Sequence, residues 1–101
     1  MPGRARAGSS TEYRIFETDQ FLKDIEVIAR SGRPGVERKL RDVVYPVLRE
    51  HPRSGASTRK LKGYSPETWR VRIGAWRFFY QVDDEERIVF LIAASHRGSA
   101  Y

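Results

Sequence analysis

Residues 68–94 read TWRVRIGAWRFFYQVDDEERIVFLIAA, and this stretch decides the fold. Apolar residues alternate with charged or polar ones in two runs, as in half-buried strands, and a third run is continuously apolar, as in a buried central strand. The three predicted strands cover residues 68–73, 76–82 and 87–94. Gly74-Ala75 and the acidic residues 83–86 supply the turns between them, so the stretch predicts an antiparallel meander.

The residues before this meander predict one more strand and two helices. Residues 13–17 alternate as a short strand, and from Asp19, an expected N-cap, apolar residues follow helical spacing until Gly32. A second helix is expected over residues 34–50, where Pro46 should kink the helix or end its regular part. The order β-α-α-β-β-β predicts an α+β fold, in which an αα-hairpin packs on one face of an antiparallel-dominated sheet.

Length and composition limit the possible classes of protein. The 101 residues accommodate one domain, expected over residues 13–101 after a disordered lead-in at 1–12. The chain has no cysteine, which excludes disulfides, thiolate metal sites and a cysteine nucleophile, and a cytoplasmic location is the simplest expectation. The arginines near the amino terminus are not followed by an apolar run, so neither a secretory signal nor a membrane span is expected.

The charge balance favours a polyanion or an acidic protein as the partner. Lys+Arg 19 against Asp+Glu 13 gives a net charge of +6 and a pI of about 10.1. The excess is concentrated in residues 51–82, where Glu67 is the one acidic residue. Three basic residues cluster within this segment: Arg59, Lys60 and Lys62. The cluster is interpreted either as a solvated loop or as part of an RNA phosphate track.

Four side chains of the predicted hairpin are expected on one face of the sheet: Arg70, Arg72, Arg77 and Phe79. If Gly74-Ala75 form a two-residue type II′ turn, Arg72 faces Arg77, whereas a longer loop would shift the pairing. Two facing cations repel by roughly 1 kcal/mol in water to about 4 kcal/mol near a protein surface, and a bound phosphate reverses the sign. The face is therefore interpreted as a phosphate site, with a solvated sheet face as the alternative. Phe79 either stacks on a nucleobase or packs under the sheet edge.

The residues after the last predicted strand include His96, Arg97 and Tyr101. A lone histidine is more often structural than catalytic, so these three side chains gain a functional role only if the tail folds back over the arginines. The sequence shows no cluster of metal ligands, and neither a metal nor another cofactor is expected.

Three segments resemble the RelE/ParE superfamily of toxins from type II toxin–antitoxin systems: Leu61-Lys62-Gly63, the strands within 69–92, and the tail 95–101, SHRGSAY. The resemblance covers residues 13–101. It implies a metal-independent mRNA endonuclease, acting on the ribosome or on free mRNA, and inhibited by a cognate antitoxin. It also implies a toxin–antitoxin complex that can bind operator DNA through the antitoxin. Carried over by position, the catalytic site comprises Arg70, Arg72, Arg77, Arg97 and Tyr101.

Two departures from the family pattern bear on the mechanism. Arginine stands at positions 70 and 72 where RelE-like members have lysine, and arginine clamps phosphate but is a poor proton acceptor. The spacing from Arg97 to Tyr101 is also shorter than in RelE. Cleavage by a 2′-hydroxyl attacking its neighbouring phosphate needs a proton acceptor and a proton donor, and His96 and Tyr101 are the candidates.

Two other functions stay open at this point. A ParE-like member of the superfamily inhibits DNA gyrase and cuts no RNA. A degenerate toxin acts only as corepressor together with its antitoxin. Assays of mRNA cleavage, DNA supercoiling and growth arrest distinguish the three functions.

Overall fold

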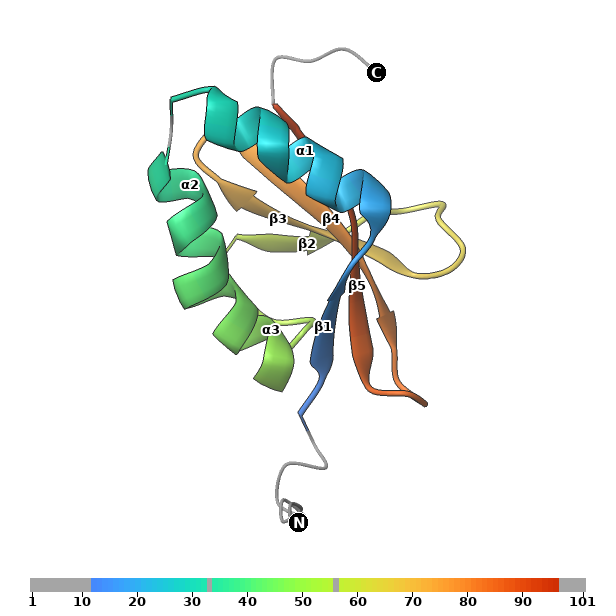
Figure 1. Ribbon diagram of the computed structural model, residues 1–101. Coiled ribbons are helices and arrows are strands. Elements are labelled where there is room, and N and C mark those ends of the chain that lie inside the picture. Colours follow the sequence, from blue (N-terminus) through green and yellow to red (C-terminus); the bar gives the residue numbers. More distant parts are fainter. Residues whose placement is uncertain (1–11, 33, 56, 97–101) are drawn as a thin grey trace.

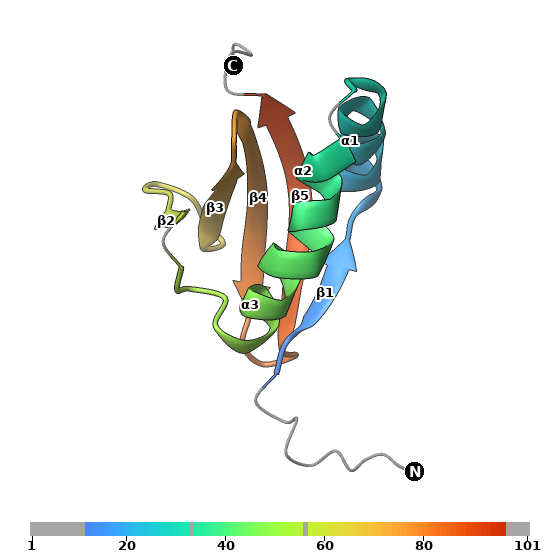
Figure 2. The same ribbon diagram turned by 90° about the vertical axis from the view of Figure 1, so that its left-hand side faces the viewer.

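The computed structural model describes residues 12–32, 34–55 and 57–96, which form a five-stranded sheet with the helices on one side (Figures 1 and 2). The strands are β1 (Arg14–Glu17), β2 (Thr58–Lys60), β3 (Thr68–Ile73), β4 (Trp76–Asp83) and β5 (Ile88–His96). Their order is β1-β5-β4-β3-β2, with β1 parallel to β5 and the other neighbours antiparallel. The α+β fold and the meander of β3, β4 and β5 are confirmed. Of the expected lead-in, residues 1–11 lie outside the described residues.

One strand was not expected from the sequence. A loop is the expected structure for the basic cluster that begins at Arg59, but Thr58–Lys60 forms β2, which pairs antiparallel with β3. Three residues are too few to show a period-2 pattern, which explains the wrong assignment. The strand sets the basic residues of this segment on alternating faces of the sheet edge.

The N-cap of the first helix, α1 (Asp19–Arg30), is Thr18 and not the expected residue, Asp19. Thr18 Oγ1 accepts a hydrogen bond from the Phe21 amide at 3.3 Å and donates one to the Leu91 carbonyl at 2.9 Å. Asp19 is the first helical residue, where its negative charge suits the positive end of the helix dipole. Thr18 therefore both caps α1 and ties it to β5, and such a cap typically contributes about 1 kcal/mol.

The second helix has three segments: α2 (Pro34–Lys39), the π-helical η2 (Leu40–Val44) and α3 (Tyr45–Glu50). In the wide turn the Tyr45 amide donates to the Leu40 carbonyl, five residues back. Pro46 has no amide hydrogen, and its ring clashes with the carbonyl four residues earlier in a regular α-helix. The π turn just before Pro46 moves this carbonyl aside, so the helix continues through the proline to Glu50.

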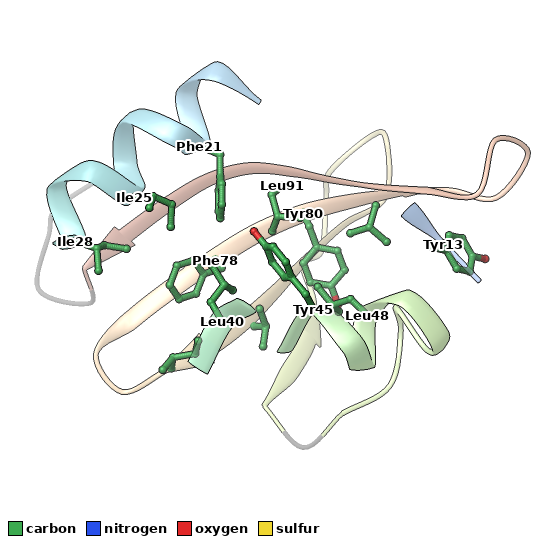
Figure 3. Packing of buried hydrophobic residues seen from close by; sticks show 13 residues of the cluster. Tyr13, Phe21, Ile25, Ile28, Leu40, Tyr45, Leu48, Phe78, Tyr80 and Leu91 are labelled. Atoms are coloured by element: carbon green, nitrogen blue, oxygen red, sulfur yellow. The ribbon is translucent and has the colours of Figure 1, made fainter. Parts of the chain in front are cut away.

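The core lies between the helices and the inner face of the sheet (Figure 3). Phe78 and Tyr80 of β4 are completely buried, and the Phe78 ring lies 6.1 Å from the ring of Phe21 on α1. Trp69 and Trp76 pack partly buried against the same cluster, on the core side of the sheet. The inner face is therefore used for packing, and no helix formed by the described residues lies on the opposite face of the sheet.

A network around Arg53 fastens the loop before β2 to two distant turns. Its guanidinium group lies 2.7 Å from Glu67 Oε2 and 2.9 Å from Asp84 Oδ2, and Asp84 also accepts a hydrogen bond from the Tyr13 hydroxyl. The hydrogen bonds from Arg53 lower the pKa of both carboxyl groups. The folded chain therefore stabilises the charged forms of Glu67 and Asp84 relative to their protonated forms.

This network predicts a change in acid stability on replacing Arg53 with methionine. Carboxyls with lowered pKa in the folded state stabilise it above their ordinary pKa values, 4.5 and 3.8, and this contribution disappears as the pH falls below them. The variant is expected to lose less stability than the wild type between about pH 6 and pH 3, as measured by urea midpoints. Arg30→Met serves as control, because Arg30 only approaches the exposed Glu26 to 3.9 Å. Parallel pH curves for wild type and Arg53→Met would contradict the assignment.

Candidate nucleic-acid interface

The β3–β4 hairpin pairs two arginines directly across the strands. Arg72 lies opposite Arg77, and Ile73 lies opposite Trp76. Gly74 has a φ of 59°, whereas Ala75 does not have a positive φ, as a type II′ turn requires. The predicted two-residue turn and its register are confirmed.

Four arginines from three strands stand on the face of the sheet turned away from the helices; we call this surface the arginine face. Arg59 of β2 lies opposite Arg70 of β3, and Arg70 lies opposite Phe79 of β4. Directly paired residues point to the same side of a sheet, and so do alternate residues of one strand. The arginine face consists of Arg59, Arg70, Arg72 and Arg77, with Phe79 beside them.

No carboxylate neutralises the arginine face within residues 12–32, 34–55 and 57–96. The Nε atoms of Arg70 and Arg77 are buried and have no hydrogen-bond partner there. A buried donor left unpaired costs about 1–3 kcal/mol, which a ligand that accepts hydrogen bonds would recover. Desolvation lowers the pKa of Arg70, and the neighbouring guanidinium charges lower it further. The surface is thus prepared for an anion with several acceptor oxygens.

Two hollows flank these arginines. One, of about 330 Å³, is polar and is lined by Ser57, Thr58, Arg59, Arg70, Arg72 and Gly74. The other, of about 520 Å³, is mostly apolar and is lined by Leu61, Tyr64, Thr68, Arg77, Phe79 and the residues 92–95 of β5. Arg77 therefore joins a cationic surface to an apolar hollow.

Residues 15–101 match the family model described as the ParE toxin of the type II toxin–antitoxin system parDE. The chain belongs to this toxin family. Its fold is similar to that of archaeal RelE from Pyrococcus horikoshii in a complex with RelB, with a TM-score of 0.68 and 23% identity over 88% of this chain and 99% of that one. It is also similar to the isolated E. coli RelE toxin, with a TM-score of 0.65 and 28% identity over 87% of each chain. No curated protein matches the sequence.

The basic cluster before β3 does not act as one unit in this toxin. Arg59 lies on the arginine face, but Lys60 lies opposite Trp69 on the other side of the sheet edge, where its charge acts on Glu67. Lys62 is exposed in the turn after β2. Because β2 is a strand and not a loop, Arg59 and Lys60 point to opposite sides of the sheet edge, and of these two only Arg59 lies on the arginine face.

His96 does not join the arginine face of the toxin. It lies opposite Trp76, and their rings meet edge to face at 5.1 Å on the helix side of the sheet. Ser95 is the residue that lies opposite Arg77. The other two predicted tail residues, Arg97 and Tyr101, lie outside the described residues.

The cause is a bulge in β5, where Ile92 is an extra residue between Leu91 and Ala93. Leu91 pairs with Tyr80, whereas Ala93 pairs with the preceding residue of β4, Phe79. The alternation of β5 is reversed beyond this point. Even-numbered residues past the bulge face the helices, so the histidine is turned away from the guanidinium groups.

Tyr64 was missed at the sequence level. It lies in the loop between β2 and β3, its side chain is 61% exposed, and it lines the apolar hollow with Phe79. A loop has no periodic hydrophobic pattern that would single out one of its residues. A large aromatic residue directly after Leu-Lys-Gly in a basic segment was nevertheless a signal of a binding surface. In the part of the toxin that the structure describes, no group of three or more potential metal ligands is present, and no helix is long and apolar enough to span a membrane.

Proposed function

We propose that this toxin is an mRNA endonuclease that acts in the cytoplasm, by preference on ribosome-bound mRNA, and cleaves with side chains alone. The observation that carries the proposal is the facing pair Arg72 and Arg77, together with the buried, unpaired Nε atoms of Arg70 and Arg77. A phosphodiester supplies both the negative charge and the acceptor oxygens that this surface requires. Similarity in fold to RelE toxins supports the same function.

The proposed reaction is an internal transesterification. The 2′-oxygen attacks the adjacent phosphorus, the new P–O2′ bond forms and the P–O5′ bond breaks. The proton of the 2′-hydroxyl goes to a general base, and the leaving 5′-oxygen receives a proton from a general acid. Arg72 and Arg77 stabilise the charge on the phosphorane, and Arg70 holds a neighbouring oxygen.

Proton transfer is the part that the arginines do not provide, because guanidinium stays protonated. We assign it to the tail, with Tyr101 as the proton acceptor and Arg97 as a group that orients the scissile phosphate. His96 contacts Trp76 on the other side of the sheet and needs a rearranged tail to take part.

The products test this mechanism. RNA fragments are expected to carry 2′,3′-cyclic phosphate and 5′-hydroxyl ends, which mass spectrometry identifies directly. Cleavage is expected to persist in excess chelator, because the attacking group belongs to the RNA itself. Fragments with 5′-phosphate ends, formed only with a divalent metal, would replace this mechanism by attack of a metal-activated water.

Inhibition of DNA gyrase is the second candidate function. Two observations favour it: the matching family model is that of the ParE toxin, and no residue of the described arginine face is a good proton acceptor. If this function is correct, the purified toxin blocks supercoiling by gyrase and leaves mRNA intact. A supercoiling assay beside an mRNA cleavage assay separates the two functions.

A cognate antitoxin is the proposed protein partner. The similar RelE structures include complexes with RelB from P. horikoshii and of RelBE from E. coli. An acidic antitoxin segment laid across the arginine face would supply the missing counter-charges and block the proposed RNA site. Binding of the complex to operator DNA would then depend on the antitoxin.

A further inference from the structure

We propose that the apolar hollow beside Arg77 is a nucleobase site, with Tyr64 and Phe79 as its stacking residues. The inference rests on the proposed function, because the base belongs to the RNA whose phosphate the arginine face holds. The inference adds a binding site for a base to the proposed function. It also adds Tyr64, which was not among the predicted site residues, and a preferred class of base.

Arg77 connects the two parts of this site. It lines the apolar hollow, and it lies opposite Arg72. We call the pair of Arg72 and Arg77, which is proposed to hold the RNA phosphate, the phosphate clamp. A single nucleotide joins its base to its phosphate through one sugar, so one nucleotide can occupy both places. If a phosphate binds between the two arginines, its base can reach Phe79. Phe79 lies two residues after Arg77 on β4 and points to the same face of the sheet.

The lining of the hollow suits a flat, uncharged ring. Leu61, Ile92 and Ala93 supply apolar surface, and Tyr64 and Phe79 supply two aromatic rings. The volume of about 520 Å³ lies within the usual range for small-ligand sites, roughly 300–1,000 Å³. A side chain such as Tyr64, 61% exposed beside this apolar surface, is available for stacking on a base.

The bulge in β5 contributes to the same hollow. The extra residue Ile92 is part of its lining, as are Ala93 and Ser95, which both lie beyond the bulge. β-Bulges often re-aim side chains next to functional sites. Here the bulge places Ala93 opposite Phe79 and Ser95 opposite Arg77, so both small side chains lie on the face of the hollow.

Two polar side chains of the lining, Thr68 and Ser95, already take part in interactions within the chain. The Thr68 hydroxyl is buried; it donates to the Pro66 carbonyl at 3.0 Å and accepts from the Gln81 amide at 3.4 Å. Ser95 also takes part in an interaction within the chain. Arg77, the charged group of the lining, is assigned to the phosphate, so the site is expected to recognise a base mainly by stacking. We expect purines to be preferred over pyrimidines, since their larger rings stack over more area.

RNA with one 2-aminopurine tests this site, because stacking on an aromatic ring quenches the fluorescence of that base. The probe is a short single-stranded oligonucleotide, 2′-O-methylated to prevent cleavage, with 2-aminopurine at each position in turn and a fluorescein for anisotropy. Binding to the full-length toxin is expected to quench 2-aminopurine strongly at one position. Replacing the base there by an abasic unit is expected to weaken binding roughly tenfold.

The variants separate stacking from general damage. Tyr64→Ala and Phe79→Ala are each expected to remove quenching and weaken binding roughly tenfold, whereas Tyr64→Phe restores both because the ring is kept. Phe16→Ala is the matched control: Phe16 is 53% exposed on the same side of the sheet but at the β1 edge, against Phe90. It is expected to leave quenching unchanged.

Two negative results have different meanings. In the first, RNA binding depends on Arg77, but 2-aminopurine is quenched at no position, or Tyr64→Ala binds RNA and quenches the probe as the wild type does. The proposed base site is then wrong, whereas the proposed phosphate clamp of Arg72 and Arg77 is retained. If the wild-type toxin binds no RNA at low salt, the proposed function fails, and the base site fails with it.

Discussion

Replacing Arg77 with alanine is expected to abolish growth arrest and to lower RNA cleavage at least about 100-fold, because a preorganised donor to the transition-state charge is lost. Arg77 lies opposite Arg72 on the arginine face and lines the apolar hollow. The variant should fold normally, since Arg77 makes no ion pair within the described chain and its buried Nε lacks a partner. Growth after induction, cleavage of mRNA in a translation extract and urea unfolding measure the three properties.

Arg30→Ala is the matched control for this variant. It removes the same charge from an exposed position of α1, where the partner Glu26 lies 3.9 Å away. The control should arrest growth as the wild type does, which separates the position of Arg77 from the net charge of the toxin. Undiminished arrest and cleavage by Arg77→Ala would remove the arginine face as the active surface.

The second large effect is expected from Phe78, the neighbour of Phe79 that points to the other side of the sheet. Phe78 is fully buried in the core against Phe21, and its truncation to alanine leaves a cavity that β4 cannot close. The free energy of unfolding should fall by about 3–5 kcal/mol, a large fraction of the roughly 5–15 kcal/mol typical of a whole domain. Urea unfolding followed by circular dichroism measures this loss.

Phe16→Ala again provides the comparison, now for stability. Its ring is 53% exposed and meets Phe90 at 5.6 Å, so the variant should lose only about 1 kcal/mol. Equal losses for Phe78→Ala and Phe16→Ala would show that the helix-facing side of β4 is not the centre of the core.

The hairpin could be predicted from sequence because its signals are local. Alternation assigned Arg70 and Arg72 to one face, and Gly74, whose φ is positive, supplied the turn that pairs Arg72 with Arg77. The long apolar run of β5 likewise indicated an interior strand, and β5 lies between β1 and β4, although β4 and not β5 is the middle strand of the sheet. The part of the candidate site that lies on these strands therefore followed from period-2 patterning and turn chemistry.

The features that were missed depend on contacts between distant segments. β2 exists because it pairs with β3, and this pairing turns Lys60 away from Arg59. The bulge at Ile92 leaves no mark in an unbroken apolar run, yet it decides on which side His96 lies. Thr18 rather than Asp19 caps α1 because its hydroxyl also reaches Leu91, 73 residues further along the chain. No local pattern reports such pairings.

The outermost strands of the sheet bear on self-association. β1 has four residues and β2 has three, and both carry charged side chains: Arg14, Glu17, Arg59 and Lys60. Long, flat, apolar edges act as templates for adding strands from other copies, and short charged ones oppose such stacking. Both borders of the described sheet thus carry features that oppose the addition of strands from other copies of the chain.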